Sequence, residues 1–276
     1  MSREILKSQI KQLLKKIVSY LSHRFPKYRY NIRLLNKFLV NYEPISIIDI
    51  GSYGGLLESW KKKDIKSILS FDPIEDRNSN KKNTIHKSAI WDQDKDISIH
   101  YTKGGGSDTL KHNKKGLIKE KWYLEKRINS KSLENFLDNT SIISEKKVKA
   151  QKLDTVLKTV GHKYDFLKID VQGAEKQILL GAEEFLKSEN CVGVLVETYT
   201  LQMFENQWLQ SEVSQFLACF KFVPVLTFPS HGSFGCSNDV LYIKCGIKSA
   251  KLNTILNTYG ILRYGDGFYE EEYLFG

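Results

Sequence analysis

Residues 166–182, FLKIDVQGAEKQILLGA, constrain the fold more than any other stretch of this chain. An apolar run ends in Asp170, Gly173 follows three residues later, and apolar residues then recur at the spacing of a helix. A short apolar run that stops at a turn is typical of a buried strand, and a strand leading into a helix is half of a βαβ unit. The segment therefore predicts a parallel sheet covered by helices.

The same alternation of strand and helix continues along the chain from residue 45. Apolar or alternating runs predict strands at 45–50, 67–71, 85–91, 97–101, 164–170, 191–197, 220–228 and 240–244. Helical spacing predicts helices at 56–63, 133–138, 153–160, 174–187 and 208–218, and we interpret 102–127 as a long loop. The sequence thus predicts an α/β fold with a mostly parallel sheet and an antiparallel hairpin of the last two strands at its edge.

Positive charge is concentrated at the N-terminus. Residues 1–40 contain ten basic residues and one acid, which accounts for nine of the ten net positive charges. Because the rest of the chain is close to neutral, we do not expect a nucleic-acid-binding surface. We divide the chain into a basic helical arm at 1–42, a catalytic domain at 43–247, and a C-terminal helix with an acidic and aromatic tail at 248–276.

The arm at 1–40 has apolar residues at spacings of three and four, with lysines on the opposite face, and so predicts a basic amphipathic helix. We expect it to pack on the main domain; attachment to an acidic membrane surface or a protein partner is the alternative. The four cysteines lack metal-ligand spacing, and we find no signal-peptide core and no apolar run of membrane length. We therefore expect a cytoplasmic protein, peripheral at a membrane if the arm attaches there; the sequence leaves the oligomeric state open.

Four of the predicted strands deliver an acid at or near their ends: Asp49, Asp72, Asp170 and Glu197. In an open α/β sheet, ligands bind outside the carboxyl ends of the strands. A buried carboxylate is unfavourable unless it is paired or hydrogen-bonded. Four carboxylates at the same edge of the predicted sheet therefore indicate that they line one common cleft.

The first strand runs into a glycine-rich loop, DIGSYGG at 49–55. Tyr53 stands where the dinucleotide fingerprint requires glycine, and no GK[ST] sequence follows the turn, so NAD, FAD and a P-loop nucleotide are disfavoured. Asp72 closes the second strand about twenty residues later, which suits the ribose diol of a nucleoside that carries no pyrophosphate. S-adenosylmethionine fits this pattern.

Five segments, IIDIGSYGG, SFDP, KLDTVL, FLKIDVQGAEKQILLGA and VGVLVET, resemble the FkbM-type S-adenosylmethionine-dependent methyltransferases over roughly residues 45–245. The resemblance implies a doubly wound, seven-stranded, Rossmann-like class I methyltransferase fold and methyl transfer to a hydroxyl of a sugar, glycan or natural product. It also implies cofactor contacts from the first loop, from a ribose-binding acid and from a stretch near the adenine: Asp49, Gly51, Ser52, Tyr53, Gly54, Gly55, Asp72, Ser88, Ala89 and Asp92. Gln172 and Tyr53 depart from the family pattern, which commonly has glutamate and asparagine there.

A hydroxyl acceptor benefits from a base that takes its proton. We expect Asp170, Glu197 and Glu175 to be the catalytic carboxylates, with His231, between the last two strands, as an alternative base. A structural role is the competing interpretation, in which Asp170 supports the following turn and helix and Glu197 holds neighbouring loops. We predict no metal site.

Three further features leave alternatives open. Residues 104–110, GGGSDTL, form either a hinged cover over the site or a plain flexible loop. The lysines that follow, with two aromatic residues, form either a site for an anionic acceptor or a solvated charged surface: Lys111, Lys114, Lys115, Lys119, Lys121, Lys126, Trp122 and Tyr123. Asp92 and Asp94 resemble the acidic motif of metal-using glycosyltransferases, a rival enzyme class, and a catalytically inactive binding module is the rival outside the enzymes.

Overall fold

The computed structural model describes residues 42–53, 55, 60, 64–74, 78–127, 135–161, 163–229, 236–247 and 249–259. The predicted N-terminal arm lies outside this part of the chain, as do most of the helix predicted at 56–63, Gly54, His231 and the tail beyond residue 259. The chain divides into two compact units. One comprises Ser46–Leu56 and Lys66–Lys244, and the other comprises Met1–Ile45, Leu57–Ile65 and Cys245–Gly276.

In the unit that contains both chain ends, the described residues include helix α9 (Ala250–Thr258). The hydroxyl of Ser249 caps this helix by accepting a hydrogen bond from the Lys251 backbone N–H at 3.1 Å. Its apolar side chains are buried, and Thr254 Oγ1 donates to the Glu43 carbonyl at 2.7 Å. The helix is therefore joined to the Glu43 segment of the same unit.

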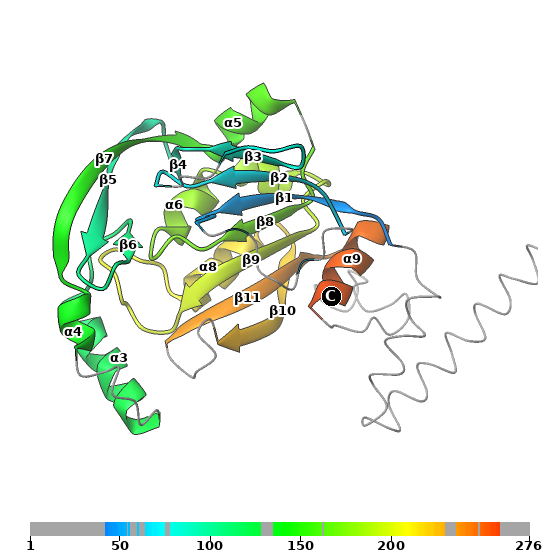
Figure 1. The fold of residues 1–276 in the computed structure, drawn as a ribbon. Helices are drawn as coiled ribbons and strands as arrows, with labels where there is room; N and C mark the ends of the chain where they lie inside the picture. The colour runs from blue at the N-terminus through cyan, green and yellow to red at the C-terminus, as the bar shows by residue number, and fades with distance from the viewer. Residues whose placement is uncertain are drawn as a thin grey trace, which may run out of the picture. The chain divides into compact units, whose positions relative to one another are not determined.

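The main unit is built on a seven-stranded sheet with the order β10-β11-β9-β8-β1-β2-β3 (Figure 1). The strands are β1 (Ile45–Ile50), β2 (Ile65–Phe71), β3 (Asn83–His86), β8 (Phe166–Ile169), β9 (Gly193–Tyr199), β10 (Phe222–Pro229) and β11 (Ser237–Lys244). β8 pairs in parallel with β1 and β9, and β2 with β3, whereas β11 runs antiparallel to both β9 and β10. The α/β class and the antiparallel pairing of the last two strands are confirmed. The sheet is mixed, however, because β11 is inserted between β9 and the edge strand β10.

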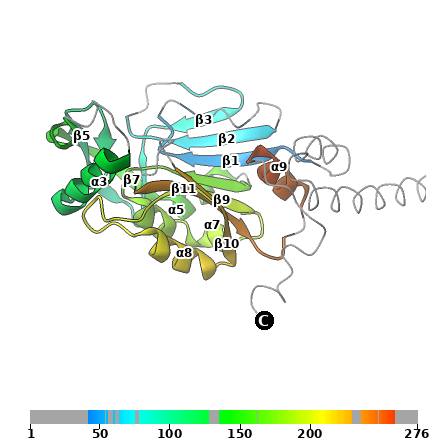
Figure 2. The same ribbon diagram turned by 90° about the horizontal axis from the view of Figure 1, so that it is seen from below.

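The central strands are buried because helices cover them. β1 and β9 are buried at every residue, as expected of strands in the middle of a covered sheet. Figure 2 shows α5 (Leu153–Val160), α7 (Glu183–Lys187) and α8 (Gln210–Ala218) on the same side of this sheet. No helix within the described ranges is long and apolar enough to cross a bilayer.

The helix predicted at 174–187 is divided into α6 (Glu175–Leu180) and α7. The break falls at Gly181, which approaches the backbone of a neighbouring strand so closely that a Cβ there would lie 2.1 Å from the Trp91 carbonyl oxygen. A side chain at this position would force the two segments apart. The sequence pattern showed the helical face but not this backbone contact.

A second sheet of four strands has the order β4-β7-β5-β6. It contains β4 (Ala89–Trp91), β5 (Lys95–Thr102), β6 (Ser107–Asp108) and β7 (Ile142–Lys152), and it is accompanied by α3 (Lys114–Arg127) and α4 (Phe136–Asn139).

Two predictions in this region were wrong. The strand predicted at 85–91 is divided between β3 and β4, which belong to different sheets, and the loop predicted at 102–127 contains β6 and α3. β7 was not predicted, because its sequence, IISEKKVKAQK, lacks an apolar alternation and is exposed along most of its length.

Candidate active site

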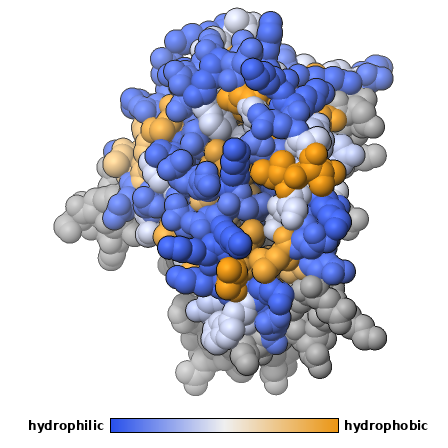
Figure 3. Space-filling model, turned by 90° about the vertical axis from the view of Figure 1, so that its left-hand side faces the viewer, coloured by the Kyte–Doolittle hydropathy of each residue, from blue (hydrophilic) through white to orange (hydrophobic). Residues whose placement is uncertain are grey.

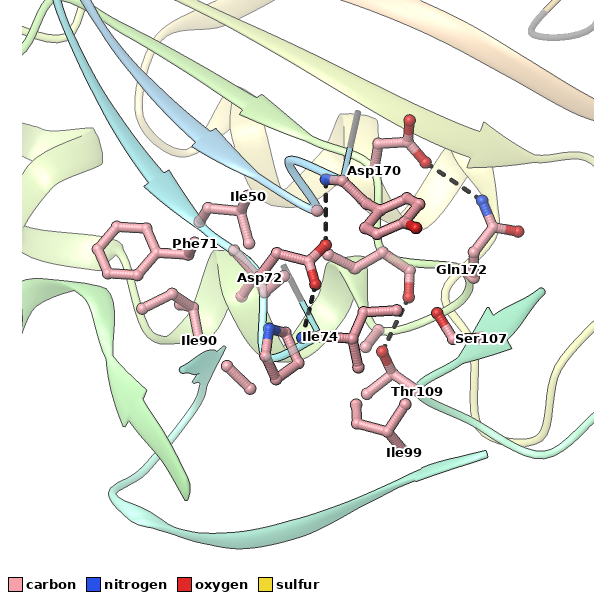
Figure 4. Close-up of a pocket in the computed structure, with 17 residues that line it drawn as sticks. Ile50, Phe71, Asp72, Ile74, Ile90, Ile99, Ser107, Thr109, Asp170 and Gln172 are labelled. Atoms are coloured by element: carbon pink, nitrogen blue, oxygen red, sulfur yellow. Dashed lines mark hydrogen bonds between the residues drawn. The ribbon is translucent and has the colours of Figure 1, made fainter. Parts of the chain in front are cut away.

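The loops that follow β1, β2 and β8 meet around a cavity in the main unit (Figure 4). Its lining includes two acidic residues, Asp72 and Asp170. The rest of the lining is largely apolar and includes Phe71, Ala89, Ile90, Ile99, Val171 and Ile178. A concave, mostly apolar site with a few convergent polar groups is the usual form of a small-molecule site.

Gly51 allows the β1 and β8 loops to come together. It has a φ of 77°, and a Cβ there would lie 1.7 Å from the carbonyl oxygen of Asp170. Only glycine fits such a contact in the left-handed region. The Gly51 N–H donates to the Phe71 carbonyl at 3.0 Å, so the same residue also joins the end of β2.

Asp72 is held in the cavity wall by the backbone. One carboxylate oxygen accepts a hydrogen bond from the Tyr53 N–H at 3.1 Å, and the other accepts from the Ile74 N–H at 2.9 Å. The residue is only 6% exposed. Because each carboxylate oxygen can accept more than one hydrogen bond, Asp72 is suited to receive the hydroxyls of a bound nucleoside.

A buried lysine, Lys168 on β8, links the acids of this edge. Its Nζ lies 3.2 Å from Asp49 Oδ1 and 3.5 Å from Asp170 Oδ2, and it donates to the Gly51 carbonyl at 3.2 Å. Burial alone would lower the pKa of Lys168, but the Asp49 and Asp170 carboxylates outweigh it and raise that pKa. The lysine therefore stays charged and compensates the buried Asp49.

Gln172 joins two carboxylates from neighbouring strands. Its Nε2 donates to Asp170 Oδ1 at 3.2 Å and to Glu197 Oε2 at 3.0 Å. Glu197 also accepts from the hydroxyls of Tyr199 at 2.7 Å and Ser237 at 2.6 Å. Burial, followed by the Glu197 charge, holds the pKa of Tyr199 well above its ordinary value, so Tyr199 remains a donor.

Glu175 lies beneath the turn that precedes α6 and is 2% exposed. Its Oε1 accepts from the Gly173 N–H at 3.1 Å. Burial, with a smaller contribution from the Glu197 carboxylate, raises the pKa of Glu175 to about 8. The side chain is not part of the cavity lining.

The structure separates the predicted site residues into two groups. Five of them line the cavity: Gly51, Tyr53, Asp72, Ala89 and Asp170. Asp49, Ser52, Gly55, Ser88, Asp92, Glu175 and Glu197 lie behind or beside the lining. Asp92 lies 3.8 Å from the Lys95 ammonium, and Asp94 accepts from the Lys152 N–H at 2.8 Å.

Sequence reasoning missed several residues of the site. Lys168 stands as the one charge inside the apolar run FLKI, and that position was the available signal. Ser107 and Thr109 line the cavity from the segment predicted as a loop, and Thr109 Oγ1 donates to the Val171 carbonyl at 3.0 Å. Residues 104–110, for which a cover and a plain loop were the two alternatives, thus contribute side chains to the cavity wall.

The family model of the methyltransferase FkbM domain matches residues 49–225. The match spans more than half of the chain and contains the cavity-lining loops that follow β1, β2 and β8. The chain belongs to the FkbM methyltransferase family. Its activity is that of a methyltransferase, and its cofactor is S-adenosylmethionine.

Two other comparisons add little to this assignment. A search of curated proteins finds no match to this methyltransferase. Among solved structures, this chain is similar to magnesium protoporphyrin IX methyltransferase from Synechocystis PCC 6803, which was solved with S-adenosylmethionine bound. The TM-score is 0.37 at 9% identity, with 87% of this chain and 81% of that chain covered. A likeness at this level decides neither the fold nor the function.

The residues of the cavity fit the cofactor of this methyltransferase. Asp72 presents carboxylate oxygens that would receive ribose hydroxyls, and Phe71, Ala89 and Ile90 provide an apolar wall that would hold the adenine.

Proposed function

We propose that this methyltransferase transfers a methyl group to a hydroxyl oxygen of a sugar, glycan or natural product. The observation that carries the proposal is the position of Asp170. Asp170 belongs to the cavity lining and its side chain is 39% exposed, yet its carboxylate is held from two sides by Lys168 and Gln172. A general base needs this combination of access and fixed orientation.

The other two predicted carboxylates are less suited to contact an acceptor. Glu197 is 2% exposed and accepts three hydrogen bonds, from Gln172, Tyr199 and Ser237. Glu175 is buried against the backbone of the Gly173 turn. Both support the loop that carries Asp170, so we assign them positioning roles.

The chain's own groups supply orientation and proton transfer. When bound, S-adenosylmethionine supplies an electrophilic methyl group. Asp170 accepts the proton of the acceptor hydroxyl, while Lys168 and Gln172 keep its carboxylate in place. Ile99 and Val171 present apolar groups that exclude water from this part of the cavity.

The proposal is tested by incubating the full chain and cofactor with a panel of hydroxylated glycans and natural products. We expect a mass gain of one CH₂ in the product and an NMR signal typical of a methyl ether. A methyl group found on nitrogen or carbon would contradict the proposal, as would nucleotide-sugar turnover without methyl transfer.

Asp170→Asn is the sharpest variant for this assay. Removing the base should lower kcat by about 100- to 10,000-fold, while cofactor affinity changes little. Asp94→Asn is the matched control, because Asp94 lies outside the cavity lining and caps the Lys152 backbone. An Asp170→Asn enzyme with undiminished kcat would rule out Asp170 as the base.

A further inference from the structure

Helix α3 has two contrasting faces. On its inner face, Leu117 is buried in a cluster with Met203 and Phe204, and Glu120 accepts from the Cys236 N–H at 3.1 Å. Gly116 approaches the chain at Gln202 so closely that a Cβ would lie 2.0 Å from its carbonyl oxygen. The inner face therefore fixes α3 against the main unit and determines which side chains point outward.

The outer face exposes large apolar side chains. Ile118 and Trp122 are 50% and 54% exposed, although residues of this type are normally buried. They are four residues apart and so lie next to each other on the helix surface. Lys114, Lys115 and Lys119 are exposed around them. These five residues are called the α3 outer face below.

The charge of the α3 outer face is uncompensated. Among the described residues, no ion pair involves Lys114, Lys115 or Lys119. Of the two acids of the same helix, Glu120 is buried on the inner face, and Glu125 pairs with Lys121 at 2.7 Å. The face therefore combines apolar side chains with three unpaired positive charges, and none of its residues lines the cofactor cavity.

Exposed apolar residues are also found next to α3. α4 contacts α3 and exposes Leu137, and the start of β7 exposes Ile142 and Ile143. Figure 3 shows the side of the molecule that carries these elements, where hydrophobic groups lie among hydrophilic ones. Apolar groups rimmed by charge mark interaction surfaces.

We propose that the α3 outer face binds the surface of a bilayer that contains anionic lipids. Tryptophan and isoleucine would enter the boundary between headgroups and acyl chains, and the lysines would extend to the lipid phosphates. The proposal concerns a surface separate from the methyl-transfer site and does not depend on the identity of the acceptor.

Other occupants match the face less well. A second copy of the chain would bring two sets of unpaired lysines together, and like charges repel. A nucleic acid would satisfy the lysines but would leave Ile118 without an apolar partner. The anionic bilayer is the occupant that satisfies both the lysines and the apolar side chains.

The test uses the full chain and vesicles of phosphatidylcholine, either alone or mixed with phosphatidylglycerol. We expect sedimentation with the mixed vesicles and little with phosphatidylcholine alone. Ile118→Ser/Trp122→Ser should weaken this binding by roughly tenfold, because apolar burial is lost. Lys115→Gln/Lys119→Gln should weaken it by a similar factor, about tenfold, because lipid charge is no longer matched.

The matched control is Lys66→Gln/Lys163→Gln, which removes the same charge from exposed positions elsewhere in the main unit. It should leave vesicle binding within about twofold of the wild type, since charge far from the surface is screened. Cofactor binding by all variants, measured by titration calorimetry, verifies that they are folded.

A spectroscopic readout locates the contact. Of the four tryptophans, Trp60 and Trp91 are 7% exposed and Trp208 is partly buried, so Trp122 is the one at the surface. Brominated phosphatidylcholine added to the mixed vesicles should quench the fluorescence of the wild type. This quenching should be lost in Trp122→Phe.

Three results would overturn the proposal. The first is no binding of the full chain to the mixed vesicles. The second is binding that the two α3 variants leave unchanged, which would assign attachment to another segment, such as residues 1–40. The third is a dimer in vesicle-free solution that dissociates in Ile118→Ser/Trp122→Ser, which would identify a second copy of the chain as the occupant.

Discussion

The carboxyl edge of the seven-stranded sheet and strand β7 of the second sheet place charged residues in opposite environments. At the carboxyl edge of the seven-stranded sheet, Asp72, Glu175 and Glu197 are at most 6% exposed, and each accepts hydrogen bonds from fixed donors. In the four-stranded sheet, the residues of β7 are exposed along most of the strand. The geometry of the site therefore depends on individual buried groups, whereas β7 depends mainly on its pairing with β4 and β5.

Among the tests of this difference, glycine substitutions have the largest expected effect on stability. Gly51→Ala places a Cβ 1.7 Å from the Asp170 carbonyl oxygen at a φ of 77°, so the β1 and β8 loops must separate. We expect the free energy of unfolding, measured by urea denaturation, to fall by at least about 4 kcal/mol. Cofactor binding should be lost with it.

Gly105→Ala is the matched substitution in the second sheet. Gly105 has a φ of 84°, but a Cβ there would meet no atom within 4 Å. The cost should be limited to the left-handed backbone, about 1–2 kcal/mol. Equal losses of stability in the two variants would show that the two sheets do not differ in the way we describe.

The same contrast explains which parts of the structure could be predicted from sequence. Strands such as β1 are mostly apolar and buried at every residue, and their acids lie at a shared edge, so the pattern predicted both the sheet and its cleft. β7 and α3 consist largely of polar residues, so their apolar periodicity is weak. Their structure depends on distant partners, namely β5 for β7 and the chain near Gln202 for α3.

Within the site, residue type was predictable but the division of roles was not. Asp72 and Asp170 face the cavity, whereas Asp49 is buried beside Lys168 and Glu197 is held by side-chain donors. These assignments depend on which side chains meet across strands that are far apart in sequence. No local pattern contains that information.

Cofactor affinity gives an intermediate test, because two predicted cofactor acids lie at different places. Asp72 is in the cavity wall, whereas Asp92, next to the second sheet, lies near Lys95 and outside the lining. Asp72→Asn should weaken S-adenosylmethionine binding by about 1.5–3 kcal/mol in titration calorimetry, because a charged acceptor is lost. Asp92→Asn should bind as the wild type does. If both variants bind equally well, the ribose assignment is wrong.

The smallest effect concerns the pH dependence of stability. The pKa of Glu175 is raised to about 8, from an ordinary value of 4.5, chiefly by burial. A group with a raised pKa stabilises the fold fully below its unfolded pKa, and this contribution is lost as pH rises through the folded value. The wild type should therefore lose stability between pH 4.5 and pH 8, while Glu175→Gln should lose less.

We expect the loss of stability between pH 4.5 and pH 8 to be about 1 kcal/mol larger in the wild type than in Glu175→Gln. Urea denaturation at both pH values measures the difference.

Glu145→Gln in the second sheet is the control. Glu145 is exposed, and a hydrogen bond from the Ser98 hydroxyl lowers its pKa, so its contribution is lost on acidification instead. Parallel pH profiles for the wild type and Glu175→Gln would mean that Glu175 is already ionised in the folded protein. The sheet edge would then hold Glu175 as a further negative charge, beside the carboxylates that Lys168 pairs with and that Gln172 donates to.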